Sequence, residues 1–371
     1  MRRIIINGAN GYVASNFIYK LLEQDYEVVA LVRENEKYSA EERMDHVLSQ
    51  INNGPFTKPG NLSVYLYSLS DEDFSMPEAR LQEIFGKEAD YFHFAASLKY
   101  DKKSKDEIFQ VNVGGVENSI KIFSKYASGN SRFFLAGTAY SCGKWEGRFD
   151  EKFYPDEDIS AFRNYYEMSK RLAENVVRKH IENNGLNGHI LRLSQVVGDS
   201  RTGETKTDYG IFDFSKRVHN LAKRYPGRTV RVHVDPEGTQ NVIPIDTAVN
   251  YLCQTAEKGP LPVIMNFTGN RPIKNESIIN ALNKLLPIHL VPVKDLKHKE
   301  MTSLERLMAV GMSFTGNYNS LNIRFDTSKR DSVLSPQINE INEETVFKML
   351  KYFLENITEK GAKKETASVS Q

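Results

Sequence analysis

The hydrophobic positions near the start of the chain follow two different periods. Residues 4–6 are three consecutive isoleucines, as in a parallel strand that is buried on both faces. After a short turn, apolar side chains recur at helical spacing, at Val13, Phe17, Ile18, Leu21 and Leu22. A second apolar run, 28–32, follows at once. The stretch 3–33 therefore predicts a strand, a helix and a second parallel strand.

The turn inside this unit has the spacing G-x-x-G-x-x-A, formed by Gly8, Gly11 and Ala14. The first glycine suits a tight turn, the second lets backbone approach a pyrophosphate, and the small third residue lets the helix pack closely on the strand. A helix that starts here points its N–H groups at the turn, which predicts a dinucleotide phosphate site. We expect that site at Gly8, Asn10, Gly11, Tyr12 and Val13.

The end of the second strand bears on which dinucleotide is bound. A site that prefers NAD(H) usually has an acidic residue there for the ribose 2′-hydroxyl, whereas this chain has Arg33. A guanidinium can pair with a 2′-phosphate, so the sequence favours NADP(H) over NAD(H). The alternative is an Arg33 that only extends into solvent.

Apolar runs and helical stripes continue to alternate along the chain. Further strands are predicted at 62–67, 91–97, 132–136 and 189–193, and helices at 108–126 and around 165–181. This alternation predicts an α/β fold of the Rossmann type, with a doubly wound parallel sheet and a smaller, mostly helical C-terminal substrate subdomain. We expect the following division: an NADP-binding domain at 1–203, a substrate-binding subdomain with elements returning to the first domain at 204–357, and a disordered tail at 358–371.

Composition and charge exclude several classes of function. With 49 basic against 48 acidic residues, the net charge of +1 gives no basic footprint for nucleic acid or an anionic membrane. The two cysteines, Cys142 and Cys253, make no disulfide framework, and no His/Cys cluster has metal-ligand spacing. With the first strand at residue 3 and no apolar run of membrane-spanning length, we expect no targeting peptide, no membrane partner and a cytoplasmic location.

Candidate chemistry gathers where the predicted strands end. Tyr166 and Lys170 stand four apart in a run without Gly or Pro, so they share one face of a helix. The motif Y-x-x-x-K is weak alone, and a second copy at 140–144 runs through a Ser-Cys-Gly turn that cannot present both side chains from one face. Thr138 follows the fifth strand, at the edge where such a sheet binds its ligand.

These three residues suit the reduction of a carbonyl. Tyr166 would donate its phenolic proton to the carbonyl oxygen, Thr138 would hydrogen-bond the same oxygen, and Lys170 would lower the Tyr166 pKa and hold the nicotinamide ribose. The alternative is that Tyr166 and Lys170 are an ordinary pair of neighbouring side chains on a helix, without a catalytic role. Four more residues are expected beside the cofactor: Ala95, Ala96, Ser97 and Asn112. Asn112 could instead be a helix cap, and we interpret His93 as a structural residue of an apolar strand.

Several segments together resemble one known superfamily. They are N-G-A-N-G-Y-V-A, Y-F-H-F-A-A-S, Asn112-Val113-x-Gly115, G-T-A-Y-S-C-G and Y-E-M-S-K. The chain resembles the extended, or atypical, short-chain dehydrogenases/reductases over about its first two hundred residues. With L-R-L-S-Q-V-V-G-D-S-R-T-G-E-T it is most similar to the branch of thioester reductase domains and fatty acyl-CoA reductases.

The resemblance implies a Thr138, Tyr166 and Lys170 catalytic triad and an NADP(H) site at Gly8, Gly11, Ala14 and Arg33. It also implies a monomer or homodimer, since relatives dimerise through the helices matching 108–126 and 165–181. The chain departs from the family pattern at Asn7 for Thr, Ala14 for Gly, Ser68 for an adenine-side Asp, and Leu193 for a frequent Pro.

Three hypotheses for function follow. The first is an NADP(H)-dependent reductase of a carbonyl or thioester in a small-molecule or carrier-tethered (or CoA-linked) substrate. The second is a nucleotide-sugar epimerase or dehydratase with tightly bound NAD, and the third is an inactive NADP sensor or scaffold. The substrate itself is not defined by the sequence. Candidate pocket walls, by composition only, are Tyr209, Phe212, Phe314 and Tyr318, and each fits a core position better.

Overall fold

The computed structural model describes residues 2–311, 318, 321–336 and 341–368 of the 371-residue chain. The chain forms two compact units. The first unit is built from three chain segments, Met1–Ser194, Ala248–Phe267 and Phe325–Pro336. The second unit contains the intervening segments, Gln195–Thr247 and Thr268–Arg324, together with the chain from Gln337 onward.

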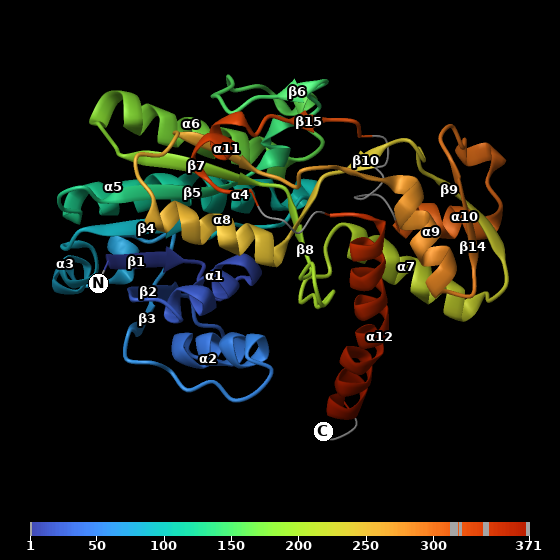
Figure 1. Ribbon diagram of the computed structural model, residues 1–371, viewed down its shortest axis with the longest axis horizontal. Helices are drawn as coiled ribbons and strands as arrows, with labels where there is room; N and C mark the ends of the chain where they lie inside the picture. Colours follow the sequence, from blue (N-terminus) through green and yellow to red (C-terminus); the bar gives the residue numbers. More distant parts are fainter. Residues whose placement is uncertain (1, 312–317, 319–320, 337–340, 369–371) are drawn as a thin grey trace. The chain divides into compact units, whose positions relative to one another are not determined.

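A parallel sheet forms the centre of the first unit (Figure 1). Within the described residues it has seven strands in the order β12-β7-β5-β4-β1-β2-β3. All neighbours are parallel, and the order reverses between β1 and β4, which is the switch point where doubly wound sheets bind ligands. The strands are β1 (Arg2–Asn7), β2 (Tyr26–Val32), β3 (Leu62–Leu66), β4 (Ala89–His93), β5 (Arg132–Thr138), β7 (Gly188–Leu193) and β12 (Ile264–Phe267).

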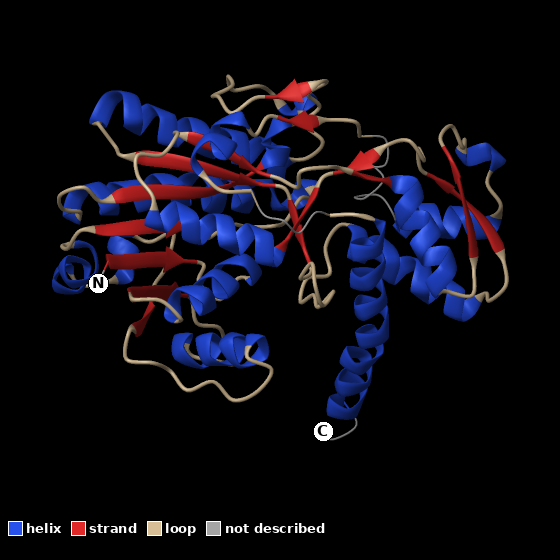
Figure 2. Cartoon of the chain, viewed as in Figure 1, coloured by secondary structure: helices blue, strands red, loops and turns tan. Residues whose placement is uncertain are grey.

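Helices cover both faces of this sheet (Figures 1 and 2). One face is covered by α1 (Tyr12–Leu22), α2 (Ala40–Ile51) and α8 (Ile245–Glu257). The other face is covered by α3 (Glu78–Phe85), α5 (Gly115–Tyr126) and α6 (Tyr165–Asn184). The remaining elements of this unit are α4 (Lys105–Phe109), the two-residue strand β6 (Arg148–Phe149), its partner β15 (Arg324–Phe325) and α11 (Ser328–Val333).

Apolar strands explain why the sheet is buried. The isoleucines at 4–6 are wholly inaccessible to solvent, as β-branched residues are in a central parallel strand. Aromatic rings fill the space between α5 and the sheet, where Tyr91 packs on Phe123 and Phe133. This packing fixes the carboxyl ends of the strands, from which the candidate site is built.

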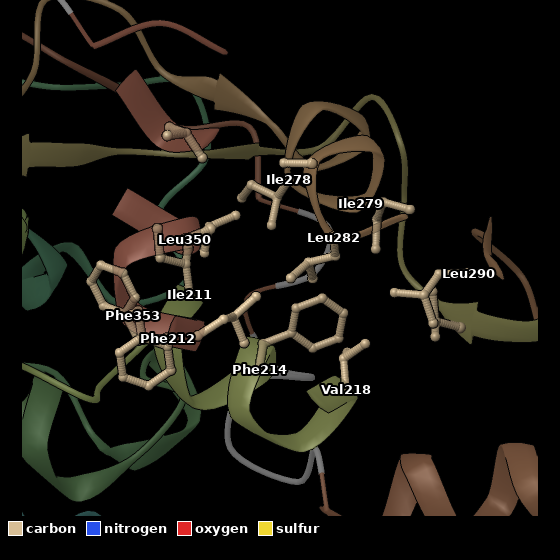
Figure 3. Close-up of a cluster of buried hydrophobic side chains, with 14 of the residues drawn as sticks. Ile211, Phe212, Phe214, Val218, Ile278, Ile279, Leu282, Leu290, Leu350 and Phe353 are labelled. Atoms are coloured by element: carbon tan, nitrogen blue, oxygen red, sulfur yellow. The ribbon is translucent and has the colours of Figure 1, made fainter. Parts of the chain in front are cut away.

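The second unit has its own apolar core (Figure 3). Helices α7 (Ile211–Arg224), α9 (Asn275–Leu285) and α12 (Glu343–Ser368) contribute side chains such as Phe212, Leu282 and Leu350, which belong to one cluster in Figure 3. Helix α10 (Ser303–Gly311) and three pairs of short strands complete the described part. The pairs are β8 (Gln195–Val197) with β11 (Val242–Pro244), β9 (Thr229–His233) with β14 (His289–Val293), and β10 (Thr239–Gln240) with β13 (Ile273–Lys274).

The Rossmann-type α/β fold predicted from the sequence is confirmed, and each predicted strand of the first unit is present. The strand predicted at 91–97 spans Ala89–His93 instead, and residues 94–97 form a loop. The sequence missed β14, where Pro292 interrupts a short apolar run, and such strands pair on one side only. Helix α12 continues to Ser368 and so extends into the segment 358–371. Residues 369–371 lie outside the described residues, and the disordered tail at 358–371 stays a prediction. Among the described residues, no helix is both long and apolar enough to cross a membrane.

Candidate functional site

The glycine turn fits a dinucleotide phosphate. Gly8 has φ +61°, and a Cβ there would lie 2.8 Å from the backbone nitrogen of Ala95, so only glycine is accommodated. Gly11 precedes the first turn of α1, which has neither a capping side chain nor an acidic residue. An uncapped helix N-terminus attracts anions, so the turn and the first residues of α1 suit a pyrophosphate.

Asn7, the last residue of β1, joins the turn to the end of β4. Its Oδ1 accepts hydrogen bonds from the backbone N–H groups of Phe94 (2.8 Å) and Ala95 (3.0 Å). Its Nδ2 therefore faces the hydroxyl of Tyr91 (2.8 Å) and Nδ1 of His93 (2.9 Å). The sequence marked Asn7 only as a departure from Thr. An amide in this place can accept and donate at once, which is the signal that could have identified it.

Asn112 lies inside a π-helical segment, Gln110–Gly114, between α4 and α5, rather than at a helix cap. Its Oδ1 accepts the N–H of Ser97 (2.7 Å), and its Nδ2 donates to the carbonyl of Ser97 (3.1 Å) and to Oγ of Ser169 (2.9 Å). Single π turns inside α-helices are frequent at functional sites. Here the π turn positions the buried side-chain amide of Asn112, which joins the loop after β4 to helix α6.

Thr138 and Tyr166 come together at the carboxyl end of β5. The Thr138 hydroxyl hydrogen-bonds the Tyr166 phenol, and the backbone N–H of Tyr140 donates to Oγ1 of Thr138 (3.2 Å). Asn164 caps α6 by accepting from the N–H of Glu167, so Tyr166 stands in a fixed first turn. Burial among protein atoms raises the pKa of Tyr166, although part of its surface stays accessible, and nearby Glu167 raises it further.

Lys170 lies one turn further along α6 and also faces β5. Its Nζ donates to the carbonyl of Ala136 (3.2 Å), and burial lowers the pKa of Lys170 to about 8, against the opposing charge of Glu174. The expectation that Lys170 lowers the Tyr166 pKa is wrong for this arrangement. Burial dominates, the Tyr166 pKa rises, and Lys170 is not among the groups that shift it.

His93 is a buried group of β4, as the sequence indicated. Because Asn7 donates to its Nδ1, the ring must accept there and is neutral. Ser119 Oγ lies 3.0 Å from the same nitrogen. Burial, together with the charge of Lys170, lowers the pKa of His93 to about 3.

Arg33 lies just beyond β2 and is exposed. The guanidinium of Arg43, on α2, donates to the backbone carbonyl of Arg33, and the nearby charge of Arg33 is among the causes that lower the Arg43 pKa, after burial. Burial raises the pKa of Tyr67 to about 12; the N–H of Gly8, which donates to its hydroxyl (3.3 Å), and the charge of Arg33 oppose this rise. Arg43 was missed, although the S-x-x-E capping box at 39–42 predicts where its helix begins.

The other predicted residues divide between the two units. Asn10 belongs to the glycine turn, Tyr12 and Val13 begin α1, and Ala95, Ala96 and Ser97 form a half-buried loop after β4. The candidate pocket walls belong to the second unit: Phe212 is wholly buried in its core, Tyr209 is exposed, Tyr318 is half-buried, and Phe314 lies outside the described residues.

The fold is of the Rossmann type, and the comparisons with known proteins indicate an NAD(P)-dependent oxidoreductase. The model of the male sterility protein family matches residues 6–252, and the chain belongs to this family. Among curated proteins it is similar to the L-2-aminoadipate reductase large subunit of Eremothecium gossypii, with 22% identity over 268 residues, which is 66% of this chain and 18% of that protein. The chain spans less than a fifth of the length of the curated relatives it matches.

Two solved structures illustrate the shared fold. The terminal R domain of the myxalamid PKS-NRPS pathway has a TM-score of 0.77 at 16% identity, covering 96% of this chain and 91% of that one. UDP-glucuronic acid 4-epimerase from Bacillus cereus, in complex with NAD, has a TM-score of 0.66 at 14% identity, covering 96% and 98%. At such identities the likeness concerns architecture alone.

Proposed function

We propose that the protein is an NADP(H)-dependent reductase of a carbonyl or thioester group in an extended, carrier- or CoA-linked substrate. The observation on which this proposal depends most is the meeting of Thr138, Tyr166 and Lys170 at the end of β5, on the same sheet edge as the glycine turn. Bound NADPH supplies the hydride. The residues of the chain supply the proton and the orientation.

Tyr166 carries a proton at neutral pH, as reduction of a carbonyl requires, since the oxygen gains a proton when its carbon gains hydride. Burial makes this phenol a weaker acid, and the hydrogen bond with Thr138 opposes that effect. Thr138 hydrogen-bonds the phenol and can orient the same carbonyl oxygen. Lys170, with its pKa at about 8, is still mostly protonated at neutral pH and can hold ribose hydroxyls.

The preference for NADP(H) rests on two arginines. Arg33, and not an acidic residue, is the first residue after β2, and Arg43 donates to its backbone carbonyl. Two guanidinium groups at this point favour a 2′-phosphate over a 2′-hydroxyl. Gly8, Asn10, Gly11, Tyr12 and Val13 would hold the pyrophosphate. The loop Ala95–Ser97, fastened by Asn112, would lie along the nicotinamide side, and the second unit would bind the substrate.

The substrate class rests on relatives. The names of the similar proteins include a reductase of L-2-aminoadipate and reductase domains of peptide and polyketide assembly lines, one of them next to a thiolation domain. An epimerase with retained NAD is the second candidate, because epimerases share the fold across nearly the whole chain. Net oxidation of NADPH distinguishes the two.

The test is to measure NADPH oxidation with octanoyl-CoA and with octanal, in the wild type and in Tyr166→Phe. We expect the variant to bind NADPH within about twofold of wild type and to lose at least a hundredfold in kcat, as general acids typically contribute. Tyr19→Phe is the matched control, with retained turnover, because it removes a tyrosine hydroxyl that bonds the Asn52 side chain near the surface. Full activity of Tyr166→Phe, or no net NADPH oxidation by a protein that retains NAD, would contradict the proposal.

A further inference from the structure

Glu151 makes contacts that the proposed chemistry does not use. It belongs to the loop between β5 and α6, and its side chain is 1% exposed. Its carboxylate accepts backbone N–H groups from Asn266 (2.7 Å), Lys329 (2.5 Å) and Arg330 (3.3 Å). These partners lie in β12 and α11. One side chain therefore joins all three chain segments from which the first unit is assembled.

The backbone carbonyls on either side of Glu151 are bound by a second buried side chain, that of Arg192. Arg192 donates to the carbonyls of Asp150 (3.0 Å) and Lys152 (2.9 Å), and it is itself fixed by a two-point ion pair with Glu174 on α6 (3.0 and 2.7 Å). Arg192 and Glu174 are both wholly buried. In the segment 150–152, two backbone carbonyls thus bind the Arg192 guanidinium, while the Glu151 carboxylate binds backbone N–H groups. These two sets of contacts together fix the conformation of the segment.

The contacts that hold α11 also position Phe325, which precedes this helix in the chain. The N–H of Asp326 donates to the carbonyl of Phe149 (3.0 Å), and the side chain of Asn266 donates to the carbonyls of Phe149 and Asp326 (3.3 and 2.7 Å). Phe325 then makes edge contacts with the rings of Phe149 and Tyr140, with centroids 6.4 Å apart in each pair.

Tyr140 connects this arrangement to the site. Its backbone N–H donates to Oγ1 of Thr138, and Thr138 hydrogen-bonds the Tyr166 phenol. The path from Glu151 runs through α11 and Phe325 to Tyr140, and it ends at the group that orients the carbonyl oxygen in the proposed reaction. On this path Glu151 is a positioning residue, since it touches none of the reacting groups.

We propose that Glu151 latches the segment Phe325–Pro336 to the first unit and thereby sets the aromatic wall, Phe325 and Tyr140, against which the substrate carbonyl is placed. The inference rests on the proposed reductase function. A carboxylate suits the latch because it accepts hydrogen bonds and donates none, whereas an amide of the same shape turns an N–H toward backbone N–H groups. The latch acts on substrate placement and leaves the NADPH site unchanged.

The first experiment needs no turnover. Glu151→Gln removes one acceptor oxygen from the latch, and Asp150→Asn makes the same chemical change at the neighbouring residue, whose carboxylate pairs with Arg148 and Lys152 near the surface. Amide hydrogen exchange in peptides covering 325–336 should become at least tenfold faster in Glu151→Gln and stay within twofold in Asp150→Asn. Equal exchange in both variants would overturn the latch whether or not the reductase function holds.

The second experiment measures kinetics with octanal and NADPH. We expect Glu151→Gln to raise KM for octanal about tenfold, with the NADPH Kd within twofold of wild type. Phe325→Leu should raise it similarly, and the double variant should be no worse than either single variant, because both changes act on one wall. Additive losses, or an unchanged KM in Glu151→Gln, would refute the positioning role. Absence of NADPH oxidation in wild type would refute the proposed function instead.

The variant Asp90→Asn is the control for general destabilisation of the fold. Asp90 lies wholly buried at the opposite, amino-terminal edge of the sheet, where it pairs with Arg132 (2.6 Å) and Arg2 (2.8 Å). This variant should lower thermal stability while leaving KM for octanal unchanged. A KM rise in Asp90→Asn that matches the rise in Glu151→Gln would show that general destabilisation accounts for the effect.

Discussion

Removal of the Arg33 side chain tests the cofactor preference directly. Arg33 is exposed beyond β2, so Arg33→Ala should leave the fold intact. A hydrogen bond to a charged group contributes about 1.5–3 kcal/mol, and solvent screening favours the lower end at an exposed site. We therefore expect the NADPH Kd to rise about tenfold, since 1.4 kcal/mol corresponds to one factor of ten.

Binding of NADH should not depend on the Arg33 side chain. NADH has no 2′-phosphate, so its Kd should stay within about twofold in Arg33→Ala. Arg33→Asp adds a carboxylate that repels the phosphate and can accept from a ribose hydroxyl, and it should reverse the preference toward NADH. Arg43 supplies a second charge that the structure places beside Arg33, so Arg33→Ala/Arg43→Ala should lose more NADPH affinity than either single variant.

Fluorescence titration of both dinucleotides measures these constants. Arg178→Ala is the control, because Arg178 is a partly exposed arginine that pairs with Glu182 near the end of α6. The NADPH affinity of wild type should also fall between low and high salt more than that of Arg33→Ala, since salt screens exposed charges. An NADPH to NADH ratio that is the same in Arg33→Ala and wild type would refute the assignment.

Three further outcomes follow from the buried part of the site. Burial holds the His93 pKa at about 3, below its unfolded value of ~6.5. The contribution of neutral His93 to stability is therefore present above pH ~6.5 and is lost as pH falls. In urea unfolding, the free energy of unfolding of wild type should fall by about 2 kcal/mol more than that of His93→Gln between pH ~6.5 and ~5. Gly8→Ala should abolish NADPH binding because of its φ and its contact with the β4 loop, whereas Gly60→Ala, where a Cβ meets nothing within 4 Å, should bind normally. Asn112→Ala leaves buried partners unpaired and should cost about 1–3 kcal/mol in the free energy of unfolding.

Short-range patterns account for what the sequence predicted well. The strand, glycine turn and helix at 3–33 are set by neighbours in the chain, and the spacing of Tyr166 and Lys170 fixes their shared face. The direction of the Tyr166 pKa could not be predicted, because it depends on how many atoms surround the phenol after folding. The sequence indicates the candidate residues Thr138, Tyr166 and Lys170, and burial shifts the pKa values of Tyr166 and Lys170.

Long-range contacts account for what was missed. Asn7 meets the loop after β4 only because β1 and β4 pair at the centre of the sheet, and no local pattern contains that pairing. Glu151 is one of many acidic residues in its loop, and its partners lie more than a hundred residues away. Arg43 acquires its place beside Arg33 through the loop that precedes α2. Such residues become visible once the strand order is known.

Transfer of a labelled hydride tests the central claim most directly. NADPH with deuterium at the transferable position of its nicotinamide is mixed with octanal and excess enzyme, and the product is analysed by mass spectrometry after a single turnover. The account predicts one deuterium in the alcohol from wild type and almost none from Tyr166→Phe at equal NADPH occupancy. Unlabelled product, or labelled product formed equally fast by Tyr166→Phe, would contradict a reductase that uses Tyr166 as its proton donor.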